Sequence, residues 1–234
     1  MRGWTGSGRL ALAVGGLLAT NLLGPPPGGR VEGQEPAVVR GRVEIGIPVS
    51  TRRPTTAYPT RSVPTPKLAA ESERRNVVVY VRDARPQRVT PTRAVIRQHD
   101  EMFTPRVVAV TVGSDVEFPN DDPIYHNVFS LSRAKNFNLG RFPRGESRRV
   151  RFDRPGVVKV FCEIHSHMSA TVMVFDHVWF AVPDEAGRFE LPPLAPGDRQ
   201  ITAWHERLGD TTVTVRLESG RAVEADFTLP VPEK

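Results

Sequence analysis

The 234-residue sequence has little cysteine, few aromatic residues and no long amphipathic helical period. Its single cysteine, Cys162, excludes an internal disulfide and any zinc site built from cysteine pairs. Aromatic residues make up 7% of the chain and nowhere interleave with basic residues on a strand, so no nucleic-acid-binding module is predicted. With 22 prolines and 19 glycines, the chain instead carries frequent turn signals.

Short alternating segments between these turn signals predict β-strands. Residues 106–118 (RVVAVTVGSDVEF) alternate valines with other residues on either side of a Gly-Ser turn, and residues 148–152 (RRVRF) alternate arginine with apolar side chains. In residues 157–162 (VVKVFC), the same alternation places Cys162 on one face with two valines, opposite a lysine. Apolar side chains at every second position are typical of half-buried strands. The predicted fold class is therefore all-β, a sandwich or a barrel.

Residues 1–34 have the pattern of a signal peptide. Arg2 and Arg9 precede a largely apolar stretch of fourteen residues at 10–23, and a Gly/Pro breaker follows. That length is short for a membrane span and favours a secretory signal with an uncertain cleavage site over an uncleaved anchor. No cysteine follows at the position of a bacterial lipoprotein anchor. We therefore expect an exported protein, periplasmic or extracellular.

The next segment, residues 35–105, contains two predicted strands (RGRVEI and NVVVYVR) around a Pro- and Thr-rich loop at residues 47–67. Residues 35–106 hold 14 basic and 7 acidic residues, whereas residues 107–234 hold 15 and 18. The basic character of the chain therefore lies in this front segment. A loop of this composition is interpreted as solvated, with docking on an anionic surface as the alternative.

Five potential metal ligands occur in the middle of the chain. Cys162 is followed closely by His165, His167 and Met168, and His126 comes just after an earlier predicted strand. A thiolate, two imidazoles and a thioether form the ligand set that selects copper in blue-copper centres. We predict His126, Cys162, His165 and Met168 as the ligands of one type 1 copper ion, and His167 as an exposed loop residue.

The other polar residues near this set are not predicted to bind the metal, but two of them are expected to orient its ligands. Asn120 and Asn127 are the candidates for hydrogen bonds that orient the ligands, because an asparagine beside the first histidine can reach the cysteine loop. Asp121 and Asp122 are expected to be solvated in a turn. No ligand role is predicted for the remaining histidines or for a methionine that is expected in the core: His99, His177, His205 and Met173.

Residues 106–176 resemble a cupredoxin of the plastocyanin-like kind. The resemblance is carried by the runs Phe118-Pro119-Asn120, His126-Asn127-Val128 and Phe161-Cys162, with His165 and Met168 beyond them. It implies a Greek-key β-sandwich in which three of the four copper ligands lie on one loop between the last two strands. Only two residues separate His165 from Met168, where plastocyanins have a longer spacer, and this makes His167 a competing axial ligand.

Residues 177–234 carry a second β pattern, with turns about every 10 to 12 residues as in antiparallel hairpins. Residues 184–209 (DEAGRFELPPLAPGDRQITAWHERLG) are similar to the carboxypeptidase regulatory-like domain, a small prealbumin-like sandwich. That resemblance implies a C-terminal β-sandwich without catalytic residues. The combination also resembles exported proteins labelled methylamine-utilization proteins, a label that fixes no activity.

The predicted function is that of an exported mononuclear copper protein that carries single electrons for a redox partner such as a cytochrome. Phe161 and Glu163 flank Cys162, whereas copper nitrite reductases and multicopper oxidases need a histidine directly beside this cysteine. Six histidines are too few for a trinuclear cluster, and one cysteine excludes the binuclear centre of cytochrome oxidase. The alternatives are a single-copper catalytic site with Glu163 as a ligand and a periplasmic copper-delivery or storage protein. Zinc is a less favoured candidate for the bound metal than copper, because a thioether contributes little to zinc binding.

Overall fold

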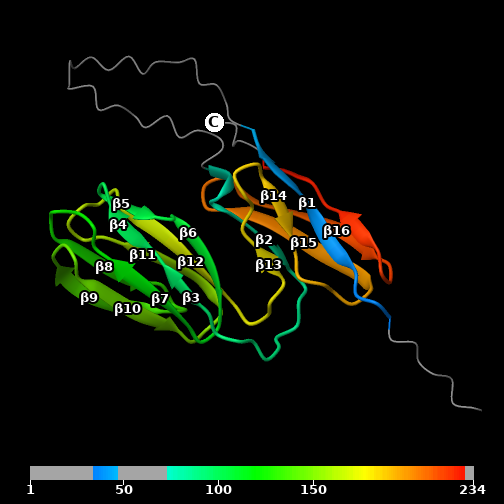
Figure 1. Ribbon diagram of the computed structural model, residues 1–234, viewed down its shortest axis with the longest axis horizontal. Helices are drawn as coiled ribbons and strands as arrows, with labels where there is room; N and C mark the ends of the chain where they lie inside the picture. The colour runs from blue at the N-terminus through cyan, green and yellow to red at the C-terminus, as the bar shows by residue number, and fades with distance from the viewer. Residues whose placement is uncertain (1–33, 47–72, 230–234) are drawn as a thin grey trace, which may run out of the picture. The chain divides into compact units, whose positions relative to one another are not determined.

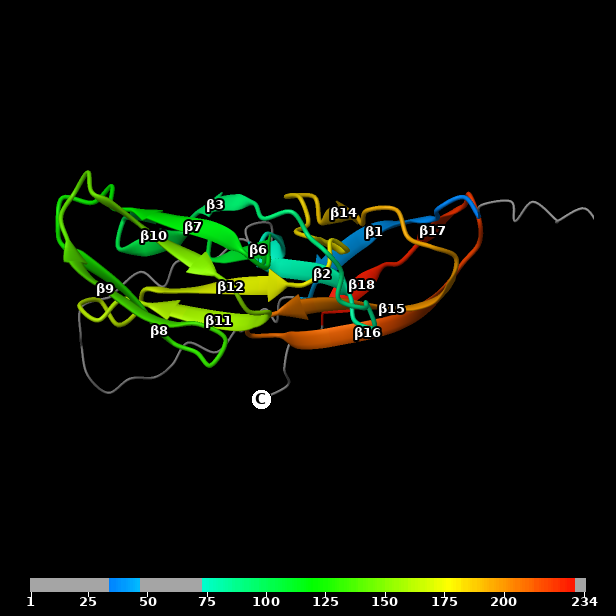
Figure 2. The same cartoon turned by 90° about the horizontal axis from the view of Figure 1, so that it is seen from below.

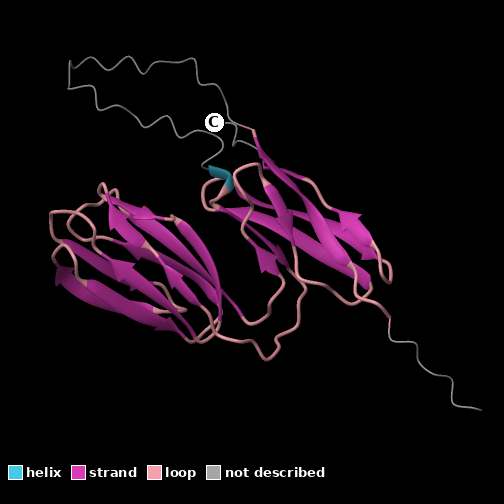
Figure 3. Ribbon diagram, viewed as in Figure 1, coloured by secondary structure: helices cyan, strands magenta, loops and turns pink. Residues whose placement is uncertain are grey.

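The computed structural model describes residues 34–46 and 73–229, which consist mostly of β-strands (Figure 3). The predicted all-β sandwich class is confirmed. The predicted signal peptide at residues 1–34, except for its last residue, and the predicted loop at residues 47–67 lie outside the described residues. No helix in the described part of the chain has the length and apolar character that crossing a membrane requires.

Ten strands between residues 93 and 175 form the sandwich that contains the predicted ligands (Figure 1). These strands are β3 (Arg93–Val95), β4 (Arg97–His99), β5 (Met102–Thr104), β6 (Val107–Thr111), β7 (Ser114–Pro119), β8 (His126–Leu131), β9 (Asn136–Phe142), β10 (Ser147–Phe152), β11 (Gly156–Phe161) and β12 (Ser169–Phe175). One sheet has the order β6-β12-β11-β8-β9, a second has the order β10-β7-β3, and β4 and β5 form a hairpin. Figure 2 shows the two sheets as separate layers.

Alternation of apolar and polar side chains defines the core of this sandwich. In β10, Val150 and Phe152 are buried between exposed or half-buried arginines, as the sequence predicted. The two valines on the Cys162 side of β11 are also buried. Burying side chains of this size contributes about 1.5–3 kcal/mol each. Cys162 and Met168 belong to the same buried cluster, so the predicted site lies at one edge of a packed core.

The other eight described strands form the second sandwich. They are β1 (Val38–Ile45), β2 (Val77–Val81), β13 (Phe180–Ala181), β14 (Arg188–Glu190), β15 (Gly197–His205), β16 (Gly209–Leu217), β17 (Ala222–Glu224) and β18 (Phe227–Leu229). In one sheet β1 pairs with β14, β17 and β18, and the other sheet has the order β13-β2-β15-β16. Strands β1 and β2 therefore complete the sheets of the C-terminal strands, whereas β3 to β5 belong with the predicted ligand region.

Met173 packs in a small cluster with Val78, Val107 and Phe175, which confirms its predicted place in the core. The cluster contains one face of β12, and the opposite face of the same strand packs in the larger cluster with Cys162. A strand that is buried on both faces is held rigidly, because neither face can move without opening a packed core. The ligand loop, residues 162–168, ends directly before this strand.

Candidate metal centre

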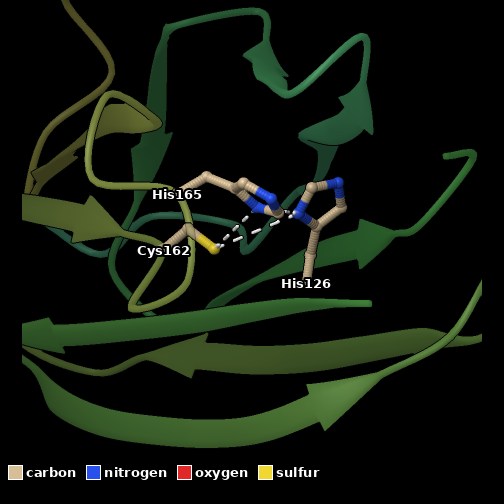
Figure 4. A group of neighbouring side chains, drawn as sticks. All are labelled: His126, Cys162 and His165. Atoms are coloured by element: carbon tan, nitrogen blue, oxygen red, sulfur yellow. Dashed lines mark hydrogen bonds between the residues drawn. The ribbon is translucent and has the colours of Figure 1, made fainter. Parts of the chain in front are cut away.

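Three side chains, one from β8 and two from the loop after β11, converge on one point (Figure 4). His126 begins β8, Cys162 directly follows β11, and His165 lies in the loop between β11 and β12. The Nδ1 atoms of His126 and His165 are 3.1 Å apart, and each lies 4.0 Å from Sγ of Cys162. His126 and Cys162 are buried, and His165 is half-buried. The structure thus brings together three of the four predicted ligands.

This triangle of donor atoms has the dimensions of a metal site. In its plane, a point about 2.1 Å from both nitrogens lies about 2.3 Å from the sulfur, which are ordinary metal–imidazole and metal–thiolate bond lengths. Two imidazole nitrogens that face each other at 3.1 Å repel through their lone pairs unless a proton or a cation lies between them. The donor set and its geometry therefore fit one metal ion.

Met168, the fourth predicted ligand, lies in the buried cluster that contains Cys162 and is 1% exposed. Two backbone hydrogen bonds close the loop before it. The amide of Met168 donates to the carbonyl of His165 at 3.0 Å, and the amide of Cys162 donates to the carbonyl of Met168 at 3.3 Å. These bonds make a compact turn of the short spacer and place Met168 at its end. Its side chain is buried in the same core as that of Cys162.

His167, the competing candidate, differs in its surroundings. Its side chain is 60% exposed, and its Nε2 lies 3.5 Å from Oε2 of Glu101. These contacts support the interpretation of His167 as a surface residue of the loop. Glu163, the ligand of the catalytic alternative, is also exposed, and it lies outside the group of three donor residues.

Asn127 connects the two chain segments that carry the donor atoms. Its side-chain oxygen accepts a hydrogen bond from the backbone amide of Glu163 at 3.2 Å. This bond is the one predicted for an asparagine beside the first histidine. Asn120 has a different role, because its side-chain amide donates to the carbonyls of Ile124 and Phe142 at 2.9 and 3.0 Å. It therefore fixes the segment that leads into His126.

The prediction that Asp122 is solvated is wrong. Asp122 is 5% exposed, and its Oδ2 lies 2.7 Å from Nε2 of His126. Burial alone would raise the pKa of Asp122, but hydrogen bonds from the amide of Glu101, the ring of His126 and the amide of Asp100 hold that pKa below its ordinary value. The turn composition around Asp122 gave no sign of a partner more than twenty residues earlier. The one local signal was a carboxylate four residues before a predicted ligand histidine.

The remaining histidines have contacts of other kinds. His99, Asp100 and Asp122 offer a second group of close donor atoms, but Asp122 is already engaged with His126. His177 is buried, and burial lowers its pKa against the opposing effect of the neighbouring Asp176. His205 is buried in a polar network rather than in apolar packing alone, since its Nε2 lies 3.1 Å from Oε2 of Glu73.

Comparison with known proteins gave matches among solved structures. No protein-family model matches the sequence. No curated protein matches it either. A copper-containing nitrite reductase from Thermus scotoductus is 24% identical over 39% of this chain, with a TM-score of 0.35. The chain spans 25% of that enzyme's length.

Two further solved structures are matched over almost their whole length. A purple cupredoxin from Nitrosopumilus maritimus is 26% identical over 35% of this chain and 99% of its own, with a TM-score of 0.32. Amicyanin from Paracoccus versutus is 19% identical over 42% of this chain and 97% of its own, with a TM-score of 0.34.

Proposed function

We propose that this protein binds one copper ion in a type 1 site and carries single electrons. The observation that carries the proposal is the convergence of His126 Nδ1, His165 Nδ1 and Cys162 Sγ at the edge of the core that contains Met168. A thiolate and two imidazoles with a weak thioether donor are the ligands of blue-copper centres. The bound copper would supply reversible one-electron redox chemistry, and Met168 would be the axial donor.

The chain around these residues supports electron transfer because it holds them in place. Every residue of β11 pairs with a residue of β12, and these two strands flank the ligand loop. Phe161 of β11 also pairs with Phe129 of β8. The donors on β8 and after β11 are therefore tied to one sheet. A rigid frame keeps the same ligand geometry for both oxidation states of copper, which keeps the energetic cost of reorganisation low.

The half-buried His165 gives the site one route to the surface. Beside it in the chain, Ile164 is exposed, and next to His126 the side chain of Tyr125 is 58% exposed. Exposed apolar residues beside an accessible ligand favour brief docking of a redox partner, because small interfaces dissociate quickly. We propose a partner protein such as a cytochrome.

We favour a carrier over a catalyst or a copper-delivery protein. A catalytic site with a carboxylate ligand would need Glu163, which is exposed and whose backbone amide is held by Asn127. Delivery would need ligands that release the ion readily, whereas His126 and Cys162 are 0% and 4% exposed. We also propose an exported location and a structural role for the C-terminal sandwich, on the sequence features described above.

The decisive experiment is an optical and paramagnetic-resonance spectrum of the copper-loaded protein. We expect an intense visible band from thiolate-to-copper charge transfer, which Cys162→Ser abolishes while circular dichroism shows an unchanged β fold. A serine variant that keeps the colour would overturn the assignment of Cys162.

A second experiment separates the carrier from the enzyme. The reduced protein is mixed with a cytochrome, and its reoxidation is followed; nitrite, nitric oxide and peroxide are then added in turn. Fast electron transfer with no spectral response to the small molecules supports the carrier. Binding and turnover of a small molecule at the copper would favour the catalytic alternative.

A further inference from the structure

The hairpin of β4 and β5 has an unusual turn. His99 pairs with Met102, so only Asp100 and Glu101 connect the two strands. Both have positive φ angles, 52° and 53°. A two-residue hairpin turn of this kind normally uses glycine at its second position, because other residues are strained in the left-handed region. A strained turn persists only when its surroundings hold it in place.

The carboxylate of Asp122 is the group that holds this turn. Its Oδ1 accepts the backbone amide of Asp100 at 2.7 Å, and its Oδ2 accepts the backbone amide of Glu101 at 2.9 Å. The same Oδ2 lies 2.7 Å from Nε2 of His126, and the side chain of Asp122 is 6% exposed. One buried carboxylate therefore joins the strained turn to a proposed metal ligand.

These contacts determine which nitrogen of His126 is free to bind a metal. Two backbone amides already donate to Asp122, so its carboxylate acts as an acceptor and the Nε2 of His126 carries the proton. The Nδ1 is then left with its lone pair toward Cys162 and His165. A carboxylate on the far nitrogen also makes an imidazole a stronger donor to a metal.

We propose that Asp122 is a positioning residue that orients the ring of His126 in the metal centre. The turn Asp100–Glu101 holds the carboxylate of Asp122 beside Nε2 of His126. This inference rests on the proposed metal-binding function. It assigns the hairpin of β4 and β5 a role in the site, although the hairpin contributes none of the proposed ligands. The turn also reaches the ligand loop, because Glu101 lies 3.5 Å from His167.

The test compares Asp122→Asn with Asp121→Asn. Both variants remove one negative charge, but Asp121 is half-exposed and pairs with Arg97 at 3.0 Å rather than with His126. Affinities for cupric and cuprous ions are measured by competition with chelators, and the reduction potential is measured on the same samples. We expect Asp122→Asn to lose about 10–100-fold in cupric affinity and Asp121→Asn to change little.

The reduction potential distinguishes a positioning role of Asp122 from a purely structural one, because a purely structural role would leave the potential unchanged. Loss of a negative charge beside His126 weakens cupric binding more than cuprous binding. For each factor of ten by which the loss of cupric affinity exceeds the loss of cuprous affinity, the reduction potential rises by about 59 mV. Equal, small shifts in Asp122→Asn and Asp121→Asn would overturn the proposal.

A measurement on the unsubstituted protein keeps the test decisive if Asp122→Asn fails to fold. In the zinc-loaded protein, we expect the Nε2 proton of His126 and the amide protons of Asp100 and Glu101 to exchange slowly with solvent. Fast exchange at these three positions would overturn the positioning role even if copper binds normally. Slow exchange in a protein that binds zinc but gives no thiolate–copper band would overturn the proposed copper function and leave the positioning role intact.

Discussion

The side chain of Asn127 links strand β8 to the ligand loop, because its oxygen accepts the backbone amide of Glu163 at 3.2 Å. Its Nδ2 donates to Oδ1 of Asn138 on the neighbouring strand β9 at 2.9 Å. Asn127 directly follows His126, and Glu163 directly follows Cys162. One buried amide therefore couples the backbone positions of two proposed ligands that lie 36 residues apart.

Replacing Asn127 with alanine should loosen this link. We expect Asn127→Ala to lower the free energy of unfolding by about 1–3 kcal/mol, because the partners of a buried amide lose their hydrogen bonds. Copper affinity should fall about tenfold, since the orientation of the ligand loop is no longer fixed from β8. Chemical denaturation and chelator competition measure the two effects. The control is Asn136→Ala at an exposed position of β9, which should change stability by less than about 0.5 kcal/mol; a similar loss in both variants would contradict the link.

Met168→Leu should retain copper and raise its reduction potential. Leucine has a similar volume and fills the same buried space, so stability should change by less than about 1.5 kcal/mol. A weak thioether stabilises cupric copper without being needed to hold the ion, and its loss therefore favours the reduced form. Met173→Leu is the matched control, because Met173 is buried in a different cluster and should leave the potential unchanged. Complete loss of copper would make Met168 a primary ligand, and an unchanged potential would point to His167 or to no axial donor.

Features that depend on neighbouring residues could be predicted from the sequence. The alternation in β10 and β11 gave the inward faces of both strands, because burial of alternate residues follows directly from strand geometry. Cys162, His165 and Met168 lie within seven residues, so a single turn between two strands brings them together. The bond from Asn127 could also be predicted, since it required only that His126 lie beside this loop.

Features that depend on partners far apart in the chain could not be predicted. Asp122 looked like a solvated turn residue because its partners, the amides of Asp100 and Glu101, are backbone groups that leave no signal in the sequence. The burial of His205 against Glu73 joins residues 132 positions apart. The pairing of β1 with the C-terminal strands could not be predicted either, because a strand with alternating apolar residues fits several partner strands equally well.

His205 should make the stability of the protein depend on pH. Burial lowers the pKa of His205 and Glu73 raises it, with a net shift below the ordinary value of 6.5. Protonation would also displace the amides of Arg207 and Leu208, which both donate to its Nδ1 at 3.2 Å. The unfolded chain therefore binds this proton more readily, and the free energy of unfolding should fall as the pH falls through 6.5 and below.

Unfolding by urea between about pH 5 and pH 8 tests this dependence. His205→Gln keeps one acceptor and one donor but does not titrate, so its stability should fall less steeply below pH 6.5 than that of the original protein. An identical slope in His205→Gln would show that protonation of His205 does not differ between the folded and unfolded states.

The copper site should survive in a fragment that contains residues 86–176 alone. All four proposed ligands, Asp122 and Asn127 lie within these residues, and so does every member of the buried cluster that contains Cys162. The fragment would expose Met173 and Phe175, which pack with Val78 in the full chain, and its free energy of unfolding should therefore be lower. We expect the copper-loaded fragment to show the same visible band as the full chain, because the donor atoms and the groups that orient them are all retained. Loss of the band in a fragment that circular dichroism shows to be folded would mean that a residue outside this range supplies a ligand.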